Sequence, residues 1–176
     1  KILTNIRKKD EKYALFSNDV YQPLDKRIKV KSNYILNTMY SNKYHSTYIN
    51  KKNKHIIIAF RGTKLLSDWI TNIYHLFTHL INSQRLKDEL KFVKNIKELF
   101  KGYNITYTGH SLGGSISCEM VRIFNKDNAI VFNAGHGPFN SSYNNLNIIY
   151  YSIIGDIVSH FGLNNYDKII LIDKNK

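Results

Sequence analysis

The sequence predicts an α/β fold, in which a mostly parallel sheet carries helices on both faces. Apolar, strand-like runs alternate along the chain with segments whose apolar residues recur at helical spacing. A Gly-x-Ser-x-Gly motif stands between one such strand and one such helix. The 176 residues, of which 43% are hydrophobic, suffice for one domain with a substantial core. We therefore expect residues 1–176 to form a single α/β domain.

The first part of the chain is expected to supply a helix and then antiparallel strands. Residues 2–18 mix charged and apolar positions and predict a helix that ends at a Ser-Asn-Asp cluster. Residues 28–36 and 44–50 tend to alternate in polarity, which is typical of strands. The polar residues 51–54 predict a hairpin turn into His55–Phe60, whose continuous apolar run favours a central strand covered on both faces.

Two helices are predicted between this strand and the motif. The segment 70–81 has apolar residues on one side, namely Ile73, Leu76, Phe77, Leu80 and Ile81. The segment 83–101 carries a clearer apolar stripe, formed by Leu86, Leu90, Val93, Ile96 and Phe100. Gly102 lies just past its end, where a glycine often terminates a helix.

The second part of the chain repeats strand and helix. Residues 104–108 predict a strand and residues 111–124 the helix that follows the motif. Further strands are expected at 129–133, 147–154 and 168–172. Strands that alternate with helices imply parallel connections, because each crossover returns the chain to the same edge of the sheet.

Ser111 is the candidate nucleophile of the motif. The tight turn between strand and helix requires small residues at Gly109 and Gly113, since a side chain there would collide with the neighbouring strand or helix. Such a turn presents the serine hydroxyl at the carboxyl edge of the sheet, in front of a helix amino terminus. The alternative is a glycine-rich turn without any chemistry.

Composition restricts the partners and cofactors. The formal charge of +13 favours anionic partners such as phospholipid head groups, although free use of lysine in a Lys-, Asn-, Ile- and Tyr-rich chain explains it equally well. Cys118 has no second cysteine to pair with, so we expect a core thiol, no disulfide and compatibility with a reducing compartment. No apolar run is long enough for a membrane-spanning helix, so we expect a soluble chain. No metal or cofactor is expected.

The chain resembles the class 3 lipases of the α/β-hydrolase fold. The resemblance rests on four pieces in order: Phe60-Arg61-Gly62-Thr63, Asp68-Trp69, the motif Gly109–Gly114, and Gly155-Asp156-Ile157-Val158. It implies a serine lipase or esterase with a short α/β-hydrolase-like sheet. Ser111 would be the nucleophile, Asp156 the acid of a Ser-His-Asp triad, and the region of Thr63 part of the oxyanion hole.

The chemistry of these residues agrees with the implied roles. A serine hydroxyl needs a histidine to take its proton and a carboxylate to orient that histidine. Asp156 follows a predicted strand, so it is expected at the same edge as Ser111; a turn aspartate is the alternative. The backbone N–H of Leu112 is one expected oxyanion donor, and the loop carrying Thr63 supplies the other.

The catalytic histidine is not assigned by the sequence. Either His160 serves as the base, four residues after Asp156, or the base lies in sequence beyond Lys176, with the domain cut short at its C-terminus. His136 is an outside candidate, and the side chain of His110 is expected to point away from the site.

Two functions follow from this reading. The first is hydrolysis of carboxylic esters of acyl lipids through an acyl-enzyme, with the segment 70–81 acting as either a lid or a core helix. The second is a lipase-like domain without activity that has a structural or protein-interaction role. A basic chain suits peripheral contact with an anionic membrane surface, whereas no nucleic-acid motif is present and nucleic acid is not expected.

Overall fold

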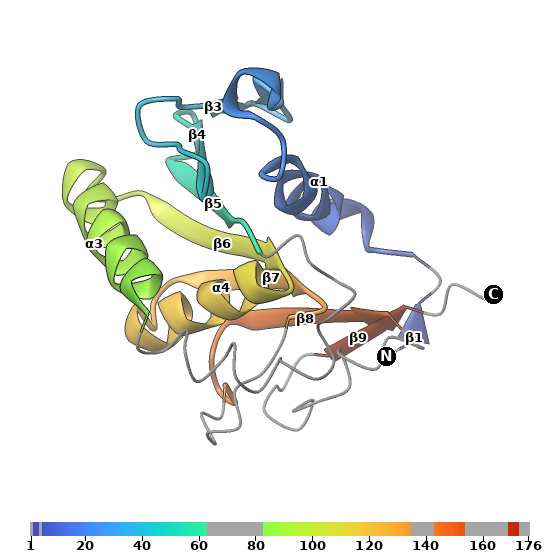
Figure 1. Cartoon of the computed structure of the whole chain (residues 1–176). Coiled ribbons are helices and arrows are strands. Elements are labelled where there is room, and N and C mark those ends of the chain that lie inside the picture. The colour runs from blue at the N-terminus through green and yellow to red at the C-terminus, as the bar shows by residue number, and fades with distance from the viewer. Residues whose placement is uncertain (1, 4, 63–82, 135–142, 154–168, 173–176) are drawn as a thin grey trace.

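The computed structural model describes residues 2–3, 5–62, 83–134, 143–153 and 169–172, which build a layered α/β structure (Figure 1). Within these residues the strands form a nine-stranded sheet in the order β1-β9-β8-β7-β6-β5-β4-β3-β2. The strands are β1 (Ile2–Leu3), β2 (Val30–Lys31), β3 (Tyr34–Leu36), β4 (His45–Asn50), β5 (His55–Phe60), β6 (Asn104–His110), β7 (Asn128–Phe132), β8 (Ile148–Ile153) and β9 (Ile169–Ile172). The helices are η1 (Lys8–Asp10), α1 (Glu11–Asp19), η2 (Leu24–Lys26), α3 (Gln84–Leu99) and α4 (Leu112–Ile123).

The sheet has a parallel part and an antiparallel part. The pairs from β5 through β6, β7, β8 and β9 to β1 are parallel, whereas the pairs β2–β3, β3–β4 and β4–β5 are antiparallel. Phe60 at the end of β5 is in register with Gly109 of β6, and His45 at the start of β4 is in register with Phe60. The carboxyl ends of β5 and β6 and the beginning of β4 therefore meet at one edge.

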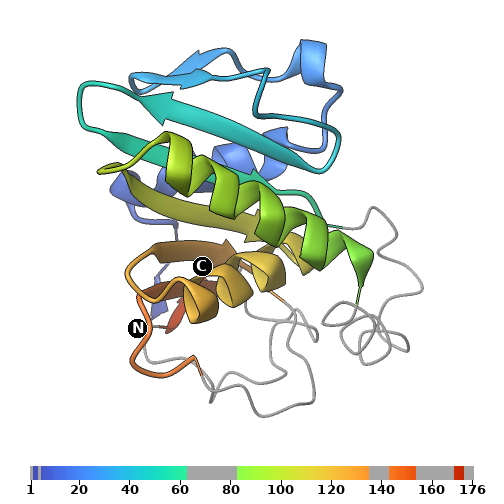
Figure 2. The same cartoon turned by 90° about the vertical axis from the view of Figure 1, so that its left-hand side faces the viewer.

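Helices cover both faces of the sheet, as the sequence predicts. Helix α1 lies on one face, and α3 and α4 lie on the other (Figures 1 and 2). Alternate residues of β5 serve the two layers: Ile56, Ile58 and Phe60 pack in the cluster with α3 and α4, and Ile57 and Ala59 pack in the cluster with α1. The continuous apolar run of β5 thus reflects burial on both sides.

The predicted bounds of the central strands and helices agree with the structure. Strands β4 to β9 and helices α3 and α4 lie within about two residues of their predicted bounds. Ser83 caps α3 by accepting a hydrogen bond from the N–H of Leu86 at 3.2 Å, and Gly102 adopts a φ of 84° beyond the helix. Cys118 is fully buried between α4 and the sheet, as expected of a core thiol.

Two predictions for the N-terminal part were wrong in extent. Residues 28–36 form two short strands rather than one, because Ser32 and Asn33 both adopt positive φ values and reverse the chain. The helix predicted over residues 2–18 begins only at Glu11, and Ile2–Leu3 instead pairs with β9. The carboxylate of Asp10 faces inward at the start of α1 and accepts a hydrogen bond from Tyr151 Oη at 2.6 Å.

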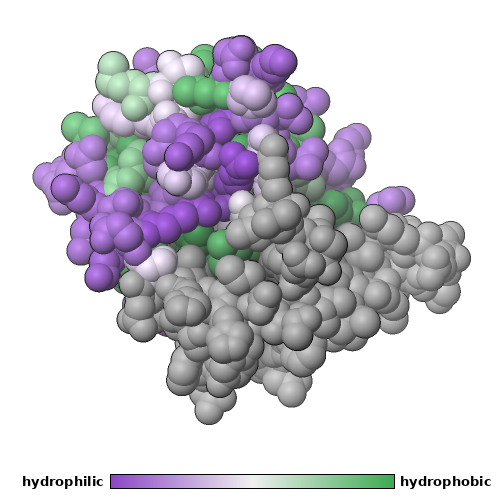
Figure 3. Space-filling view, in the orientation of Figure 1, coloured by the Kyte–Doolittle hydropathy of each residue, from purple (hydrophilic) through white to green (hydrophobic). Residues whose placement is uncertain are grey.

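The surface over α3 is largely polar (Figure 3). Hydrophilic residues dominate the part of the surface over α3 that Figure 3 displays, in line with the lysine content of this helix. Among the described helices none has the length and apolar character needed to cross a membrane.

Candidate active site

Ser111 occupies the sharp turn between β6 and α4. Its backbone has a φ of 58° and a ψ of −124°, a region that residues with a side chain rarely adopt. The strand continues to His110 and the helix begins at Leu112, so the change of direction falls on this one residue. Strand, serine and helix thus follow one another in the order that the Gly-x-Ser-x-Gly motif predicts.

Glycines make the turn possible by allowing backbone to pack against backbone. A Cβ atom on Gly113 would overlap with the carbonyl oxygen of Phe60, and one on Gly109 would overlap with the carbonyl group of Gly113. A Cβ on Gly114 would lie 2.7 Å from that of Ala134. Helix α4 therefore sits closer to β5, β6 and the end of β7 than any larger residue would allow.

The hydroxyl of Ser111 is buried and unbonded within the described part of the chain. The residue is 3% exposed, and its Oγ has no hydrogen-bond partner there. Ser117, further along α4, is fully buried too, but its Oγ donates to the carbonyl oxygen of Gly113 at 2.9 Å. Buried hydroxyl groups are usually bonded, so the state of Ser111 calls for a functional explanation.

The amino terminus of α4 follows directly after Ser111. Ser111 is the residue before α4, and its carbonyl oxygen accepts from the N–H of Ser115 at 3.1 Å. The N–H of Leu112 belongs to the first turn of the helix, whose amide groups lack acceptors within the helix and carry a partial positive charge. The sequence predicts this N–H as an oxyanion donor.

The loop after β5 packs directly against this turn. A Cβ atom on Gly62 would lie 2.8 Å from the carbonyl oxygen of His110 and 3.4 Å from the amide nitrogen of Gly113. Gly62 is thus brought beside the serine turn although the two are far apart in sequence. Thr63 is the next residue in the chain.

The remaining predicted site residues lie outside the described part of the structure. They are Thr63, Asp68, Trp69, His136, Asp156 and His160, together with the helix expected at 70–81. Strand β8 runs parallel to β7 and ends at Ile153, so the chain leaves the sheet at the carboxyl edge shortly before Asp156.

Described histidines occupy three different settings. His110 borders a cavity of about 230 Å³ with α1 residues such as Ser17 and Asn18, which agrees with a side chain directed away from the nucleophile. His55 lies at the amino edge, and burial followed by the charge of Lys12 lowers its pKa. His45 lies at the carboxyl edge, buried on the α3 side of the sheet.

No sequence pattern indicates the polar cluster around His45. Its Nδ1 lies 2.7 Å from Glu89 Oε2, and its ring stacks on Phe92 with 3.9 Å between centroids. Glu89 also approaches Arg85, and these side chains border a cavity of about 710 Å³. His45 and Glu89 are 44 residues apart, and only the packing of α3 against β4 brings them together. No set of three side chains suited to bind a metal occurs among the described residues.

Solved structures of fungal lipases share the fold. The lipase of Rhizomucor miehei in its propeptide complex is 13% identical, with 90% of this chain and 65% of that chain covered and a TM-score of 0.60. Lipase II from Rhizopus niveus is 15% identical, with 89% and 76% covered and a TM-score of 0.60. For Lip2 lipase from Yarrowia lipolytica the values are 16%, 92% and 78%, and 0.60. The chain spans slightly less than two thirds of the Rhizomucor protein.

These similarities confirm the predicted α/β-hydrolase-like fold. No curated protein matches the sequence significantly. The family described as the Tle-like phospholipase domain matches residues 7–138, a stretch that includes Gly62, Ser111 and Leu112 and covers most of the chain. The resemblance to lipases is thereby confirmed at the level of the family, and the chain belongs to the Tle-like phospholipase domains.

Proposed function

We propose that the protein is a serine hydrolase that cleaves the carboxylic ester bonds of phospholipids. The observation that carries this proposal is the strained turn at Ser111, where a buried hydroxyl without a described partner lies beside a helix amino terminus. Backbone strain and unmet hydrogen bonding are costly, and they persist mainly where function depends on them. The phospholipid substrate is supported by the family to which the chain belongs.

In the proposed mechanism, Ser111 Oγ attacks the carbonyl carbon of the ester while a histidine takes its proton. The base is His160 or a histidine that follows Lys176, and Asp156 orients it. The N–H of Leu112 and a donor near Thr63 stabilise the tetrahedral oxyanion. The intermediate collapses to an acyl-enzyme, and the leaving alcohol takes the proton from the histidine. Water then attacks the acyl-enzyme while the histidine takes its proton. The histidine returns a proton to Ser111 Oγ as the fatty acid leaves.

The charge of the chain supports a role at an anionic surface. With a net charge of +13, the protein is attracted to membranes that contain acidic lipids. The proposal therefore includes peripheral binding to such membranes and faster hydrolysis there. Because exposed charges are screened by salt, this preference is expected to weaken as ionic strength rises.

The test compares two serine variants on phospholipid vesicles. Release of fatty acid is measured from phosphatidylglycerol and phosphatidylcholine vesicles with the wild type, Ser111→Ala and Ser117→Ala. Ser117 is the matched control, because it is also a buried serine near the turn but its hydroxyl is bonded to Gly113. We expect Ser111→Ala to reduce the rate by at least about a thousandfold and Ser117→Ala to leave it nearly unchanged. A folded wild type without activity on either vesicle would contradict the proposal and favour the structural or interaction role.

A further inference from the structure

The backbone of Arg61 and Gly62 is held at three successive groups, each by a different part of the fold. The N–H of Arg61 donates to the carbonyl oxygen of Tyr44 at 2.8 Å. The carbonyl oxygen of Arg61 accepts from Arg85 Nη2 at 2.6 Å. The N–H of Gly62 donates to Tyr21 Oη at 3.1 Å. Residues just before β4, in α3 and just after α1 thus converge on one short stretch of backbone.

Arg85 reaches this stretch from the α3 side of the sheet. The same Nη2 lies 3.2 Å from the carbonyl oxygen of Tyr44, and the guanidinium lies over the Tyr44 ring, 5.0 Å from its centroid. Arg85 Nε is 3.6 Å from Glu89 Oε1, which compensates its positive charge. Burial lowers the pKa of Arg85, and the negative charge of Glu89 acts in the opposite direction.

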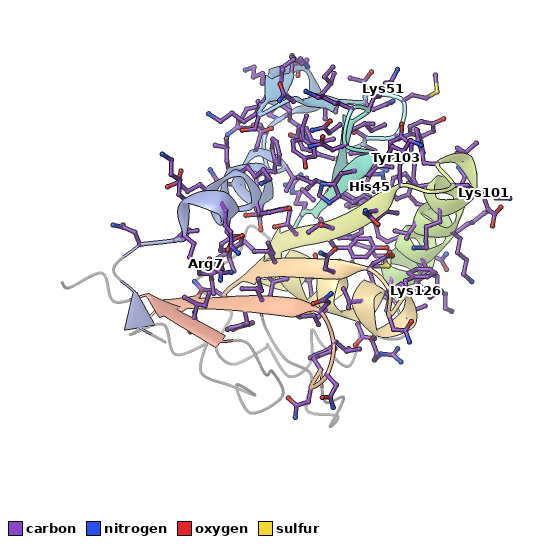
Figure 4. The ribbon with its side chains drawn as sticks, turned by 180° about the vertical axis from the view of Figure 1, so that it is seen from behind. Arg7, His45, Lys51, Lys101, Tyr103 and Lys126 are labelled. Atoms are coloured by element: carbon purple, nitrogen blue, oxygen red, sulfur yellow. The ribbon has the colours of Figure 1, made fainter. Side chains whose placement is uncertain are left out.

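His45 anchors the far end of this ionic contact. Glu89 uses its second oxygen to bind His45 Nδ1 at 2.7 Å, and both side chains are more than nine-tenths buried. Figure 4 shows His45 well inside the molecule, whereas Lys51 and Lys101 lie at its margin. The charge near Arg85 is therefore supplied by a carboxylate that is itself held in place, while Arg85 Nη2 holds the Arg61 carbonyl.

Tyr21 holds the same stretch from the opposite face. Its hydroxyl oxygen accepts from Gly62, and burial raises its pKa, so the phenol remains protonated at neutral pH. A Cβ atom on Gly62 would lie 2.6 Å from Tyr21 Oη and 2.8 Å from the carbonyl oxygen of His110. Gly62 is therefore confined between Tyr21 and the turn that carries Ser111.

We infer that Arg85 and Tyr21 are positioning residues that hold Arg61 and Gly62, and with them the start of the loop that carries Thr63, beside the turn of Ser111. The inference rests on the proposed esterase function, in which the Thr63 region supplies an oxyanion donor. Oxyanion donors act only when they point at the developing charge, and a displacement of about 1 Å can cost about a hundredfold in rate. A side chain that only filled space could be replaced by methionine, whereas holding a carbonyl oxygen requires a donor.

The test measures kcat and KM for p-nitrophenyl butyrate with Arg85→Met, Arg85→Lys and Tyr21→Phe. Arg122→Met is the matched control, because Arg122 also pairs with a glutamate on its own helix, Glu119 at 2.8 Å, but lies near the far end of α4. We expect Arg85→Met to lower kcat by about tenfold to a hundredfold with little change in KM, since the loss concerns the transition state. Arg85→Lys should recover part of kcat, and Tyr21→Phe should lose less.

A second readout does not depend on activity. Hydrogen exchange of the peptide containing Arg61 and Gly62 should accelerate in Arg85→Met and Tyr21→Phe but not in Arg122→Met, with thermal unfolding followed in parallel. Wild-type kcat and wild-type exchange in a folded Arg85→Met protein would overturn the inference, as would an equal loss in Arg122→Met. If the wild type hydrolyses no ester, the proposed function fails, and the exchange data alone decide whether these residues position the loop.

Discussion

Buried polar side chains at the amino edge of the parallel sheet contrast with Ser111 at its carboxyl edge. At the amino edge, the ring nitrogens of His55 are both bonded, to Tyr34 Oη at 2.6 Å and Thr106 Oγ1 at 2.8 Å. Asp127 is similarly satisfied, since its Oδ2 accepts from both a lysine and a tyrosine. At the carboxyl edge, Ser111 combines a positive φ with a buried hydroxyl that lacks a partner among the described residues.

The bonded side chains contribute to the stability of the fold, whereas Ser111 lowers it. A strained residue costs about 1–3 kcal/mol, and a buried group without a partner has a similar cost. Hydrogen-bonded networks at the amino edge carry no such cost. Ser111 combines both costs in one residue, next to Gly62 and at the start of α4, as expected if that edge does chemistry.

The largest expected effect on stability comes from replacing glycines at the two edges. Gly113→Ala places a methyl group onto the carbonyl of Phe60, and we expect a loss of at least about 3 kcal/mol or no folded protein. Gly102, at the amino edge, has a φ of 84° but open space around it, so Gly102→Ala should cost only about 1–2 kcal/mol. Urea denaturation of both variants measures the free energy of unfolding. Equal losses in the two variants would contradict the tighter packing of the serine turn.

Removing one hydroxyl group at each edge compares how much each group contributes to stability. Tyr107 Oη donates to Asp127 Oδ2 at 2.7 Å, so Tyr107→Phe should lower the free energy of unfolding by about 1–2 kcal/mol. Ser111→Ala removes a hydroxyl without a described partner and should leave stability unchanged or slightly higher. Chemical denaturation tests both variants, and a large loss in Ser111→Ala would mean that this hydroxyl stabilises the fold.

The smallest expected effect concerns pH and the amino edge. Burial and Lys12 lower the pKa of His55, so the unfolded chain binds a proton more readily than the folded one. The contribution of His55 is therefore fully present above its unfolded pKa and is lost as pH falls through its lower folded pKa. His55→Gln should make stability less dependent on pH in this acidic range, measured by urea denaturation at several pH values. An identical pH dependence in both proteins would contradict this account.

Local patterns were enough to predict the elements that position Ser111. The run His55–Phe60, the stripe of α3 and the small residues around the serine all act within a few residues, so the sequence alone indicates them. The position of Leu112 at the start of α4 follows in the same way, whereas its role as an oxyanion donor stays a prediction. Thr63, Asp156 and His160 stay predictions.

Contacts between distant segments could not be predicted in this way. The pairing of Ile2–Leu3 with β9 joins the two ends of the chain, and no periodicity in so short a strand announces it. The hairpin at Ser32–Asn33 depends on two positive φ values in residues other than glycine. His45 and Glu89 meet only after β4 and α3 are packed, so the cluster that holds Arg61 has no sequence signature.

The central claim, that Ser111 is an activated nucleophile, is tested most directly by covalent labelling. The folded protein is treated with a fluorophosphonate, and the modified serine is identified by mass spectrometry of its peptides. The account predicts a single adduct on Ser111, lost when the protein is unfolded beforehand and absent from its neighbours Ser115 and Ser117. No adduct on the folded protein, or equal labelling of all three serines, would contradict the claim.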